Sequence, residues 1–245
     1  MLRQLLNTHP EVMLTMEFRN FTHLGAPLPR YAGRVLWRKW KRDVVSLAHG
    51  AQRWRSRPDG VAFVLLYALG ILVNHRGGRV TLRSIRSTQH MILPRARVVG
   101  DKYPGYIYNL DRLAAHPELK PIVIYHDCRD VVASALDMAR TEWKATRFAQ
   151  SLDTPRKVAD RWVEAVAYQE RNAERILAVQ YEGLVTQPEP VLNRLGFFLG
   201  LDPSGFRPEV LRSGSIGRYQ TDLTDADLKV MNEVAGEVMR RLGYV

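Results

Sequence analysis

The sequence predicts an α/β fold in which a central parallel sheet is covered by helices on both faces. Two short apolar runs, at 121–125 and 176–184, have the length and composition of buried strands. Between and after them lie segments of ten or more residues whose apolar side chains recur at helical spacing. Strands that alternate with helices of this length form a parallel sheet in a three-layer sandwich. The ligands of such sheets bind at the carboxyl ends of the strands.

A short helix is expected near the start of the chain, at residues 2–8. The His9-Pro10 pair ends it, because proline disfavours helical geometry in the residue before it. Further along, the segment RARVVGDKYP at 95–104 is predicted to be a short strand that ends in a loop. A helix through Leu113 is expected to follow that loop.

The stretch at 35–73 is basic, carries tryptophans and is expected to be helical. Its apolar part, VAFVLLYALGILV at 61–73, contains no charged residue. It is shorter than the roughly 20 residues that a helix needs to cross a bilayer. The segment is therefore interpreted as a buried helix and not as a membrane span.

Four helices are expected in the second half of the chain from apolar residues at helical spacing. The third stops at Gly200, a residue type that commonly ends helices, and the last begins with a Thr224-x-x-Asp227 capping pattern. The four helices are expected directly after the 121–125 strand, at 154–175, at 187–199 and from 224 onward.

The chain is large enough to bury one substantial core, since it has 245 residues and 46% hydrophobic content. A single domain over residues 1–245 is therefore predicted. Lys and Arg number 36 against 25 Asp and Glu, which gives a formal net charge of +11. This excess predicts an anionic substrate or a polyanionic partner. It leaves open the choice among nucleic acid, acidic polysaccharide, nucleotide and anionic membrane surface.

Cysteine usage and the N-terminal composition indicate the compartment. Cys128 is the only cysteine, so no internal disulfide can form and a reducing, cytoplasmic environment is expected. The stretch MLRQLLNTHPEVML mixes Arg, Gln, Asn and His among its leucines and lacks the apolar core of a signal peptide. Secretion is therefore not supported.

The turn after the first predicted strand is the clearest candidate site. His126, Cys128, Arg129 and Ser134 surround the start of a helix, whose free backbone N–H groups attract anions. These residues predict a phosphate pocket. The alternative is that Asp127 only caps the helix and Arg129 extends into solvent.

The order of residues around this turn adds a family resemblance. The segment PIVIYHDCRDVVASAL closely resembles the 3′-phosphate-binding segment of the sulfotransferases that use 3′-phosphoadenosine 5′-phosphosulfate (PAPS), an apolar strand followed by R-D-P-R-D-V-x-x-S. The resemblance implies that His126 and Ser134 hold the 3′-phosphate, with His126 at the place of the family's first arginine. Histidine donates to a phosphate with both ring nitrogens only when it is protonated, so weaker and more pH-dependent binding is expected.

Two further segments resemble the same family and imply catalytic residues. MLRQLLNTHPEVMLTME resembles the helix after the phosphosulfate loop, and GDKYP resembles the K-x-P motif. By this resemblance Glu17 is the general base that takes the proton of the acceptor hydroxyl. Lys102 lies near the transferred sulfonate and offsets charge on the bridging oxygen. The alternatives are a solvated loop carboxylate and a loop lysine without a role.

The C-terminal third extends the resemblance. VQYEGLVTQPEPVLNRLGFFLGL is similar to the Y-E-D-L-x-x-x-P segment and the helix after it, which are structural in the family. RSGSIGRYQTDLT resembles the loop G-R-W-x-x-x-L, in which backbone amides and a basic residue close over the nucleotide. Gly217 and Arg218 are therefore implied as nucleotide binders, and the planar fork of arginine suits a phosphate.

The sequence lacks a strand followed by a loop such as G-x-x-R-S-G-T-T, which cradles the 5′-phosphosulfate in this family. Met1 corresponds to a place inside the helix after that loop. The resemblance therefore implies a P-loop-nucleotide-hydrolase-like fold whose first strand and phosphate loop are missing. A start codon assigned too late, a real truncation and a divergent anion binder are the three explanations. Little or no activity is expected of these 245 residues alone.

The predicted function is transfer of a sulfonate from PAPS to a hydroxyl acceptor, a carbohydrate or glycolipid, without a metal. The variable stretch at 25–95 is expected to shape the acceptor site, because its basic and aromatic residues suit an acidic or carbohydrate acceptor; a solvated basic face is the alternative. Two other functions stay open: an inactive anion- or polysaccharide-binding remnant, and a nucleic-acid binder, which dispersed charge disfavours. Peripheral membrane contact, the acceptor's identity and the oligomeric state are not decided by the sequence.

Overall fold

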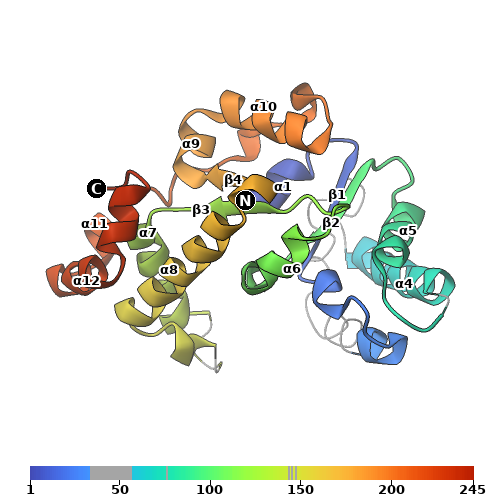
Figure 1. Cartoon of the computed structure of the whole chain (residues 1–245), viewed down its shortest axis with the longest axis horizontal. Helices are drawn as coiled ribbons and strands as arrows, with labels where there is room; N and C mark the ends of the chain where they lie inside the picture. The colour runs from blue at the N-terminus through green and yellow to red at the C-terminus, as the bar shows by residue number, and fades with distance from the viewer. Residues whose placement is uncertain (34–56, 76, 143, 145, 147) are drawn as a thin grey trace. The chain divides into compact units, whose positions relative to one another are not determined.

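The computed structural model describes residues 1–33, 57–75, 77–142, 144, 146 and 148–245. The chain divides into two compact units, the first made of residues 1–109 and 192–211 and the second of 110–191 and 212–245. Each unit contains one pair of parallel strands, and helices make up most of the remaining elements (Figure 1). The predicted α/β class with parallel strands is confirmed. The single domain over residues 1–245 stays a prediction.

The strand pair of the first unit consists of β1 (Val12–Met16) and β2 (Val98–Lys102). The two strands run parallel with Val12 opposite Val98 and Met16 opposite Lys102, so both end at the same edge. β2 confirms the strand expected at 95–104. No strand is predicted at 12–16, because the run VMLTM is short and does not alternate between apolar and polar residues.

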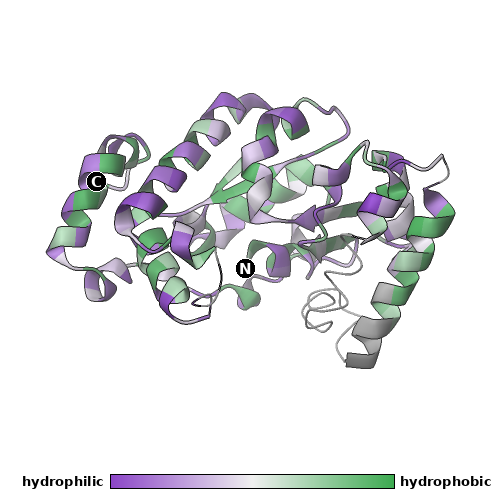
Figure 2. Cartoon of the chain, turned by 90° about the horizontal axis from the view of Figure 1, so that it is seen from below, coloured by the Kyte–Doolittle hydropathy of each residue, from purple (hydrophilic) through white to green (hydrophobic). Residues whose placement is uncertain are grey.

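Helices α4 (Arg57–Asn74) and α5 (Leu82–Ile92) pack against each other in the first unit, as Figure 1 shows. α4 buries one face with Phe63, Tyr67 and Ile71, and Figure 2 shows its mainly hydrophobic ribbon. Its other face is exposed, so the prediction of a buried helix at 61–73 is wrong for that half. A helix that is apolar all round is buried only on the side that finds a partner. The exposed apolar residues of α4 are Leu65, Leu66, Leu69, Leu72 and Val73.

The first unit is completed by short elements. Helix α1 is shorter than the helix expected at 2–8, because it already ends at Leu6. Residues 35–56 of the predicted helical stretch lie outside the described residues, so the prediction stays untested there. The short elements are α1 (Leu2–Leu6) and the 3₁₀ turns η1 (Asn20–His23), η2 (Pro104–Asn109), η5 (Pro203–Gly205) and η6 (Pro208–Val210).

The strand pair of the second unit consists of β3 (Ile122–Tyr125) and β4 (Leu177–Gln180). They run parallel, with Ile122 opposite Leu177 and Tyr125 opposite Gln180. The strand expected at 176–184 is too long, because the chain turns into helix α9 (Tyr181–Thr186) directly after Gln180. Tyr181 and Leu184 are both buried at helical spacing, which explains the apolar run without a longer strand.

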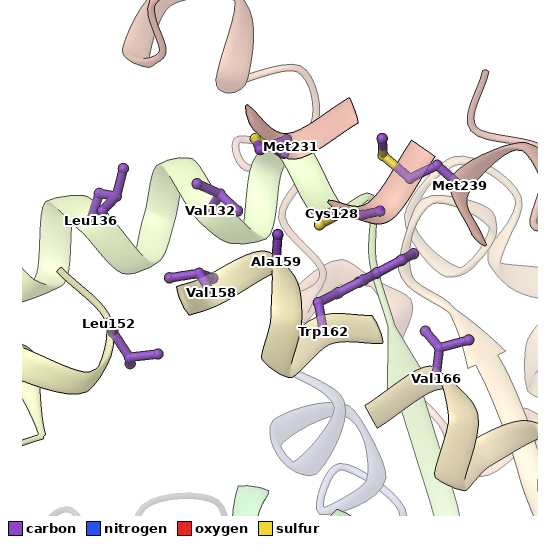
Figure 3. Packing of buried hydrophobic residues seen from close by; sticks show 11 residues of the cluster. Cys128, Val132, Leu136, Leu152, Val158, Ala159, Trp162, Val166, Met231 and Met239 are labelled. Carbon is purple, nitrogen blue, oxygen red and sulfur yellow. The ribbon is translucent and has the colours of Figure 1, made fainter. Parts of the chain in front are cut away.

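The core of the second unit lies where α7 (Cys128–Arg140), α8 (Pro155–Arg171) and α12 (Asp225–Arg241) meet (Figure 3). All three helices are predicted from the sequence. Thr224 and Asp227 form the expected capping box at the start of α12. The core residues are Cys128, Val132, Leu136, Leu152, Val158, Ala159, Trp162, Val166, Met231, Ala235 and Met239.

The remaining helices are short or link the two units. α10 (Pro188–Leu199) confirms the helix expected at 187–199. Gly200 follows it with a positive φ of 72°, which is why glycine ends the helix there. The others are α6 (Leu110–Ala114), α11 (Tyr219–Asp222) and the 3₁₀ turns η3 (Ala149–Ser151) and η4 (Ala173–Arg175).

Candidate functional site

The turn between β3 and α7 is held by an arginine and an aspartate. Asp127 caps α7 by accepting a hydrogen bond of 2.9 Å from the backbone N–H of Arg129. The Arg129 guanidinium donates to the same carboxylate at 2.6 Å and to the carbonyl oxygen of Tyr244 at 2.8 Å. It also stacks over the ring of Tyr219, 4.3 Å from the centroid. The capping role expected of Asp127 is confirmed, but Arg129 does not extend into solvent.

His126 is fixed in this turn by a carboxylate from α9. Its Nδ1 lies 2.5 Å from Oε1 of Glu182, which also accepts from the backbone N–H of Asp127 at 2.9 Å. The other oxygen of Glu182 accepts from the hydroxyl of Tyr244 at 3.1 Å. Burial raises the pKa of Glu182, but the hydrogen bonds from His126 and Asp127 outweigh it, so the pKa lies below its ordinary value. Glu182 is therefore ionised near neutral pH and keeps the Nδ1 proton of His126 in place.

The second ring nitrogen of His126 is left for another partner. Nε2 is buried and has no hydrogen-bond partner among the described residues. The carboxylate of Asp130 lies 3.9 Å from it, too far for a hydrogen bond. On the backbone side, the indole N–H of Trp162 donates to the carbonyl oxygen of His126 at 2.9 Å. The residue is thus held at Nδ1 and at its carbonyl oxygen, and Nε2 has no hydrogen-bond partner among the described residues.

The loop that carries Gly217 and Arg218 is held against helix α7. The backbone N–H groups of Gly217 and Tyr219 donate to the two oxygens of the buried Asp130, at 2.8 and 3.0 Å. The Arg218 guanidinium lies 3.3 Å from Asp137. Within the second unit, the loop therefore lies along the face of α7 that contains positions 130 and 137.

Ser134 belongs to the same face of α7. It follows Asp130 by four residues and precedes Asp137 by three, the spacings at which helical residues share a face. The structure thus brings Ser134 and the Arg218 loop to one side of the second unit. Arg218 is also paired with Asp222 at 2.7 Å, so a ligand would have to share or replace these carboxylates.

In the first unit, the structure brings Glu17 and Lys102 together. Glu17 directly follows β1 and Lys102 is the last residue of β2, so the parallel register places them side by side. The backbone N–H of Glu17 donates to the carbonyl oxygen of Lys102 at 2.7 Å. The carboxylate and the ammonium group are 3.8 Å apart and both are partly exposed. This is the position at which ligands of parallel sheets bind.

Asp101 shapes the turn that follows β1. Glu17 and Arg19 have positive φ values of 55° and 56°, a left-handed conformation that is strained for residues other than glycine. The carboxylate of Asp101 accepts from the backbone N–H groups of Phe18 at 3.1 Å and Arg19 at 2.8 Å. The hydroxyls of Thr15 and Tyr106 donate to it as well, at 2.7 and 2.6 Å. These four bonds hold Glu17 in its strained conformation beside Lys102.

Several of these residues are not predicted from the sequence. Asp130, Glu182 and Asp101 have no functional role in the sequence analysis, although each organises a predicted site residue. The sequence points to two of these carboxylates only through their neighbours. Asp130 follows Arg129 in the R-D-V motif, and Asp101 precedes Lys102. Cys128, expected near the phosphate pocket, is fully buried in the helical core.

Neither a metal centre nor a membrane span is present in the described part of the chain. Across the described residues, no three His, Cys, Asp or Glu side chains are grouped so that they could hold a metal ion. The described helices are also too short or too polar to cross a bilayer.

Parallel strands whose carboxyl ends carry cationic side chains and a helix start define an α/β protein of the kind that binds anionic ligands at these ends. The comparisons with known proteins make this more specific. The model of the sulfotransferase family matches residues 1–204, and the chain belongs to that family. The resemblance found in the sequence is confirmed at the level of the family.

A solved sulfotransferase domain from the curacin biosynthetic pathway is similar to this structure. The match has a TM-score of 0.53 and 15% sequence identity, and it covers 97% of this chain and 92% of that domain. At this identity the similarity shows the fold, which is the sulfotransferase fold. No curated protein matches the sequence.

Proposed function

We propose that this protein transfers a sulfonate group from PAPS to a hydroxyl group of an acceptor. The observation that carries the proposal is the arrangement of the second unit, where Asp130 holds the Gly217–Tyr219 loop against the face of α7 that contains Ser134. His126 lies at the start of the same helix. The four residues implied by the family resemblance thus lie on or beside one helix, α7, at whose start backbone N–H groups favour a phosphate.

The 3′-phosphate of the nucleotide would take the unsatisfied Nε2 of His126 as one donor. Because Glu182 keeps the proton on Nδ1, His126 donates from Nε2 only as an imidazolium. Arg218 is exposed enough for its ion pairs with Asp137 and Asp222 to be weak, so a phosphate dianion can compete for its guanidinium.

The chemical step is assigned to Glu17 and Lys102. The acceptor oxygen attacks the sulfur, the bond between the sulfur and the bridging oxygen breaks, and its electron pair stays on the phosphate of the leaving 3′-phosphoadenosine 5′-phosphate (PAP). Glu17 takes the hydroxyl proton, and Lys102 offsets the charge on the bridging oxygen. The products are a sulfate ester and PAP. The separation of 3.8 Å between the Glu17 carboxylate and the Lys102 ammonium group supports a base and a cation that serve one reaction centre.

The acceptor class and the location belong to the proposal as well. A carbohydrate or glycolipid hydroxyl is proposed because basic and aromatic residues are concentrated around 34–55, although these residues lie outside the described part of the chain. The lone Cys128 supports a cytoplasmic location. An inactive anion- or polysaccharide-binding protein is the second candidate, favoured by the histidine at the place of the family's arginine.

Calorimetry with PAP tests the nucleotide site. Saturable binding is expected, and Ser134→Ala and Arg218→Ala should each weaken it roughly 10- to 100-fold, because each removes a hydrogen bond to a charged group. Arg156→Ala is the matched control, since Arg156 is an exposed arginine of the same unit that pairs with Glu233 on α12. Absence of PAP binding, or binding that neither site variant changes, contradicts the proposal. Salt-sensitive DNA binding without PAP binding favours the nucleic-acid hypothesis.

Radiolabel transfer from PAPS to a panel of hydroxyl acceptors tests the chemical step. Glu17→Gln and Lys102→Ala should slow transfer by about 10²- to 10⁴-fold while PAP binding stays unchanged. Transfer by the wild-type chain eliminates the inactive alternative. PAP binding without transfer to any acceptor supports that alternative instead.

A further inference from the structure

Helix α4 presents an apolar face to solvent. Leu69 and Leu72 are 51% and 68% exposed, and three apolar neighbours are exposed with them. These positions recur at steps of three and four residues, so they form one continuous stripe along the C-terminal half of the helix. Single exposed leucines are ordinary, whereas a contiguous apolar surface marks an interaction site. This α4 stripe consists of Leu65, Leu66, Leu69, Leu72 and Val73 (Figure 2).

Helix α5 widens the apolar surface. A Cβ atom at Gly70 would meet the side chains of Thr88 and Met91, so α4 and α5 approach each other closely there. Leu66 and Val73 lie on the same side of α4 as Gly70, four residues before it and three after it. Met91 is itself 40% exposed. It therefore lies beside the α4 stripe and adds to it.

The sequence of these two helices is strongly biased in charge. Residues 60–100 contain six arginines and no Asp, Glu or Lys. Arg83 and Arg86 are exposed on α5, and Arg83 precedes Met91 by two steps of four residues, on one ridge of that helix. Arg79, between the two helices, is exposed as well. The apolar stripe is thus accompanied by cationic side chains and by no acidic side chain from this segment.

We infer that α4 and α5 dock this protein on the surface of an anionic lipid membrane. The α4 stripe enters the boundary between headgroups and acyl chains, and the arginines contact the anionic headgroups. Buried apolar area and the attraction of cationic side chains to anionic lipids both strengthen binding of this kind. α4 lies in the plane of the membrane in this arrangement, since no described helix is long and apolar enough to span a bilayer.

Charge favours a membrane over a second copy of the chain. A symmetric dimer through α4 would bring the same face of both copies together, and with it Arg83 and Arg86 of each copy. The segment 60–100 offers no carboxylate to pair with them. The net charge of +11 on each chain adds long-range repulsion. An anionic lipid surface supplies the opposite charge.

Co-sedimentation with lipid vesicles tests the inference. The full chain should bind vesicles of phosphatidylcholine and phosphatidylglycerol, and should bind phosphatidylcholine alone roughly tenfold more weakly, because that lipid carries no net charge. Leu69→Gln combined with Leu72→Gln should weaken binding to the anionic vesicles by about tenfold or more, because two inserted apolar side chains are lost. Arg83→Gln combined with Arg86→Gln should weaken it by roughly tenfold and reduce its salt dependence.

Two controls separate docking from folding and from the proposed function. Phe197→Gln is the matched apolar control, since Phe197 is 92% exposed on α10 and does not belong to the α4 stripe; it should bind vesicles like the wild type. The Leu69 and Leu72 double variant should keep the wild-type melting temperature, because both side chains are exposed. Ser134→Ala should also bind vesicles like the wild type, so failure of the nucleotide site and failure of this inference are distinguishable.

A fluorescent label at the stripe tests insertion directly. Cys128 is fully buried, so Leu72→Cys introduces an exposed thiol that an environment-sensitive dye can label selectively. The emission should shift to shorter wavelength when anionic vesicles are added, because the dye enters an apolar medium. The same dye on Phe197→Cys should show no such shift.

Absence of binding to the anionic vesicles overturns the inference. Binding that the Leu69 and Leu72 double variant leaves unchanged overturns it as well, because the stripe would then not be inserted. Analytical ultracentrifugation of the same proteins tests the other occupant. A wild-type dimer that the double variant converts to a monomer, without vesicle binding, assigns the stripe to a second copy of the chain instead.

Discussion

The turns at the two strand ends that carry the candidate residues are stabilised in different ways. At the β3–α7 turn, Asp127 is paired with Arg129, and Glu182 is paired with His126. At the end of β1 and β2, two residues adopt strained backbone conformations, and buried arginine atoms have no partner among the described residues. One turn is stabilised by its own paired charges, whereas the other depends on the hydrogen bonds that Asp101 accepts.

This difference shows which contacts each turn depends on for its stability. A turn with paired charges is ordered without a ligand and needs only one further partner at His126. A turn with strained residues is kept in place by a single carboxylate, that of Asp101. Substitutions should therefore have different effects on stability in the two units, and substitutions at four positions test this comparison.

Trp162→Ala is expected to have the largest effect on stability. Trp162 packs in the core of α7, α8 and α12 and donates to the backbone of His126. Truncation leaves a cavity and an unpaired carbonyl group, so the free energy of unfolding should fall by about 3–5 kcal/mol. Urea unfolding measures it, and Trp162→Phe, which removes the hydrogen bond but keeps most of the volume, should cost clearly less. An equal loss in both variants would mean that the hydrogen bond dominates.

Asp101→Ala and Asp130→Ala form a matched pair with an intermediate effect. The first removes the acceptor of four hydrogen bonds, two of which hold the strained turn, and should cost about 2–3 kcal/mol. The second removes the acceptor of two backbone N–H groups and should cost about 1–2 kcal/mol. Denaturant titrations of both variants give the comparison. A larger loss for Asp130→Ala would show that the strained turn does not depend on Asp101.

Glu182→Gln should have the smallest effect, and this effect depends on pH. The folded-state pKa of Glu182 lies below its ordinary value, so its contribution is fully present above about pH 4.5 and is lost as the pH falls through the folded-state value. At pH 7 the variant should be less stable than the wild type by about 0.5–1 kcal/mol. Below pH 4 the difference should shrink. A difference that stays constant between pH 7 and pH 3 would rule out an ionised Glu182 as its cause.

Much of the fold follows from local patterns in the sequence. β3, α7, α8, α10 and α12 are predicted because each has a clear apolar period and most begin or end with a capping residue. β1 escapes prediction because a five-residue run carries too little pattern. The buried-helix prediction for 61–73 fails on one face of α4, because hydrophobicity does not indicate whether both faces find a partner.

The candidate residues follow from motifs, but their supports do not. Glu17, Lys102, His126, Ser134, Gly217 and Arg218 come from family motifs, and their roles stay predictions. Asp101 acts on a turn 82 and 83 residues away in the chain, at Arg19 and Phe18. Glu182 reaches His126 across 56 residues. Contacts over such distances arise from tertiary structure, and no local pattern in the sequence encodes them.

The position of Tyr244 has a practical consequence for work with the purified protein. Its carbonyl oxygen is held by Arg129 and its hydroxyl contacts Glu182, so the penultimate residue belongs to the wall of the β3–α7 turn. An affinity tag fused after Val245 begins one residue from that wall and would alter what titrations there report. A cleavable tag, removed before any measurement, keeps this end of the chain as described.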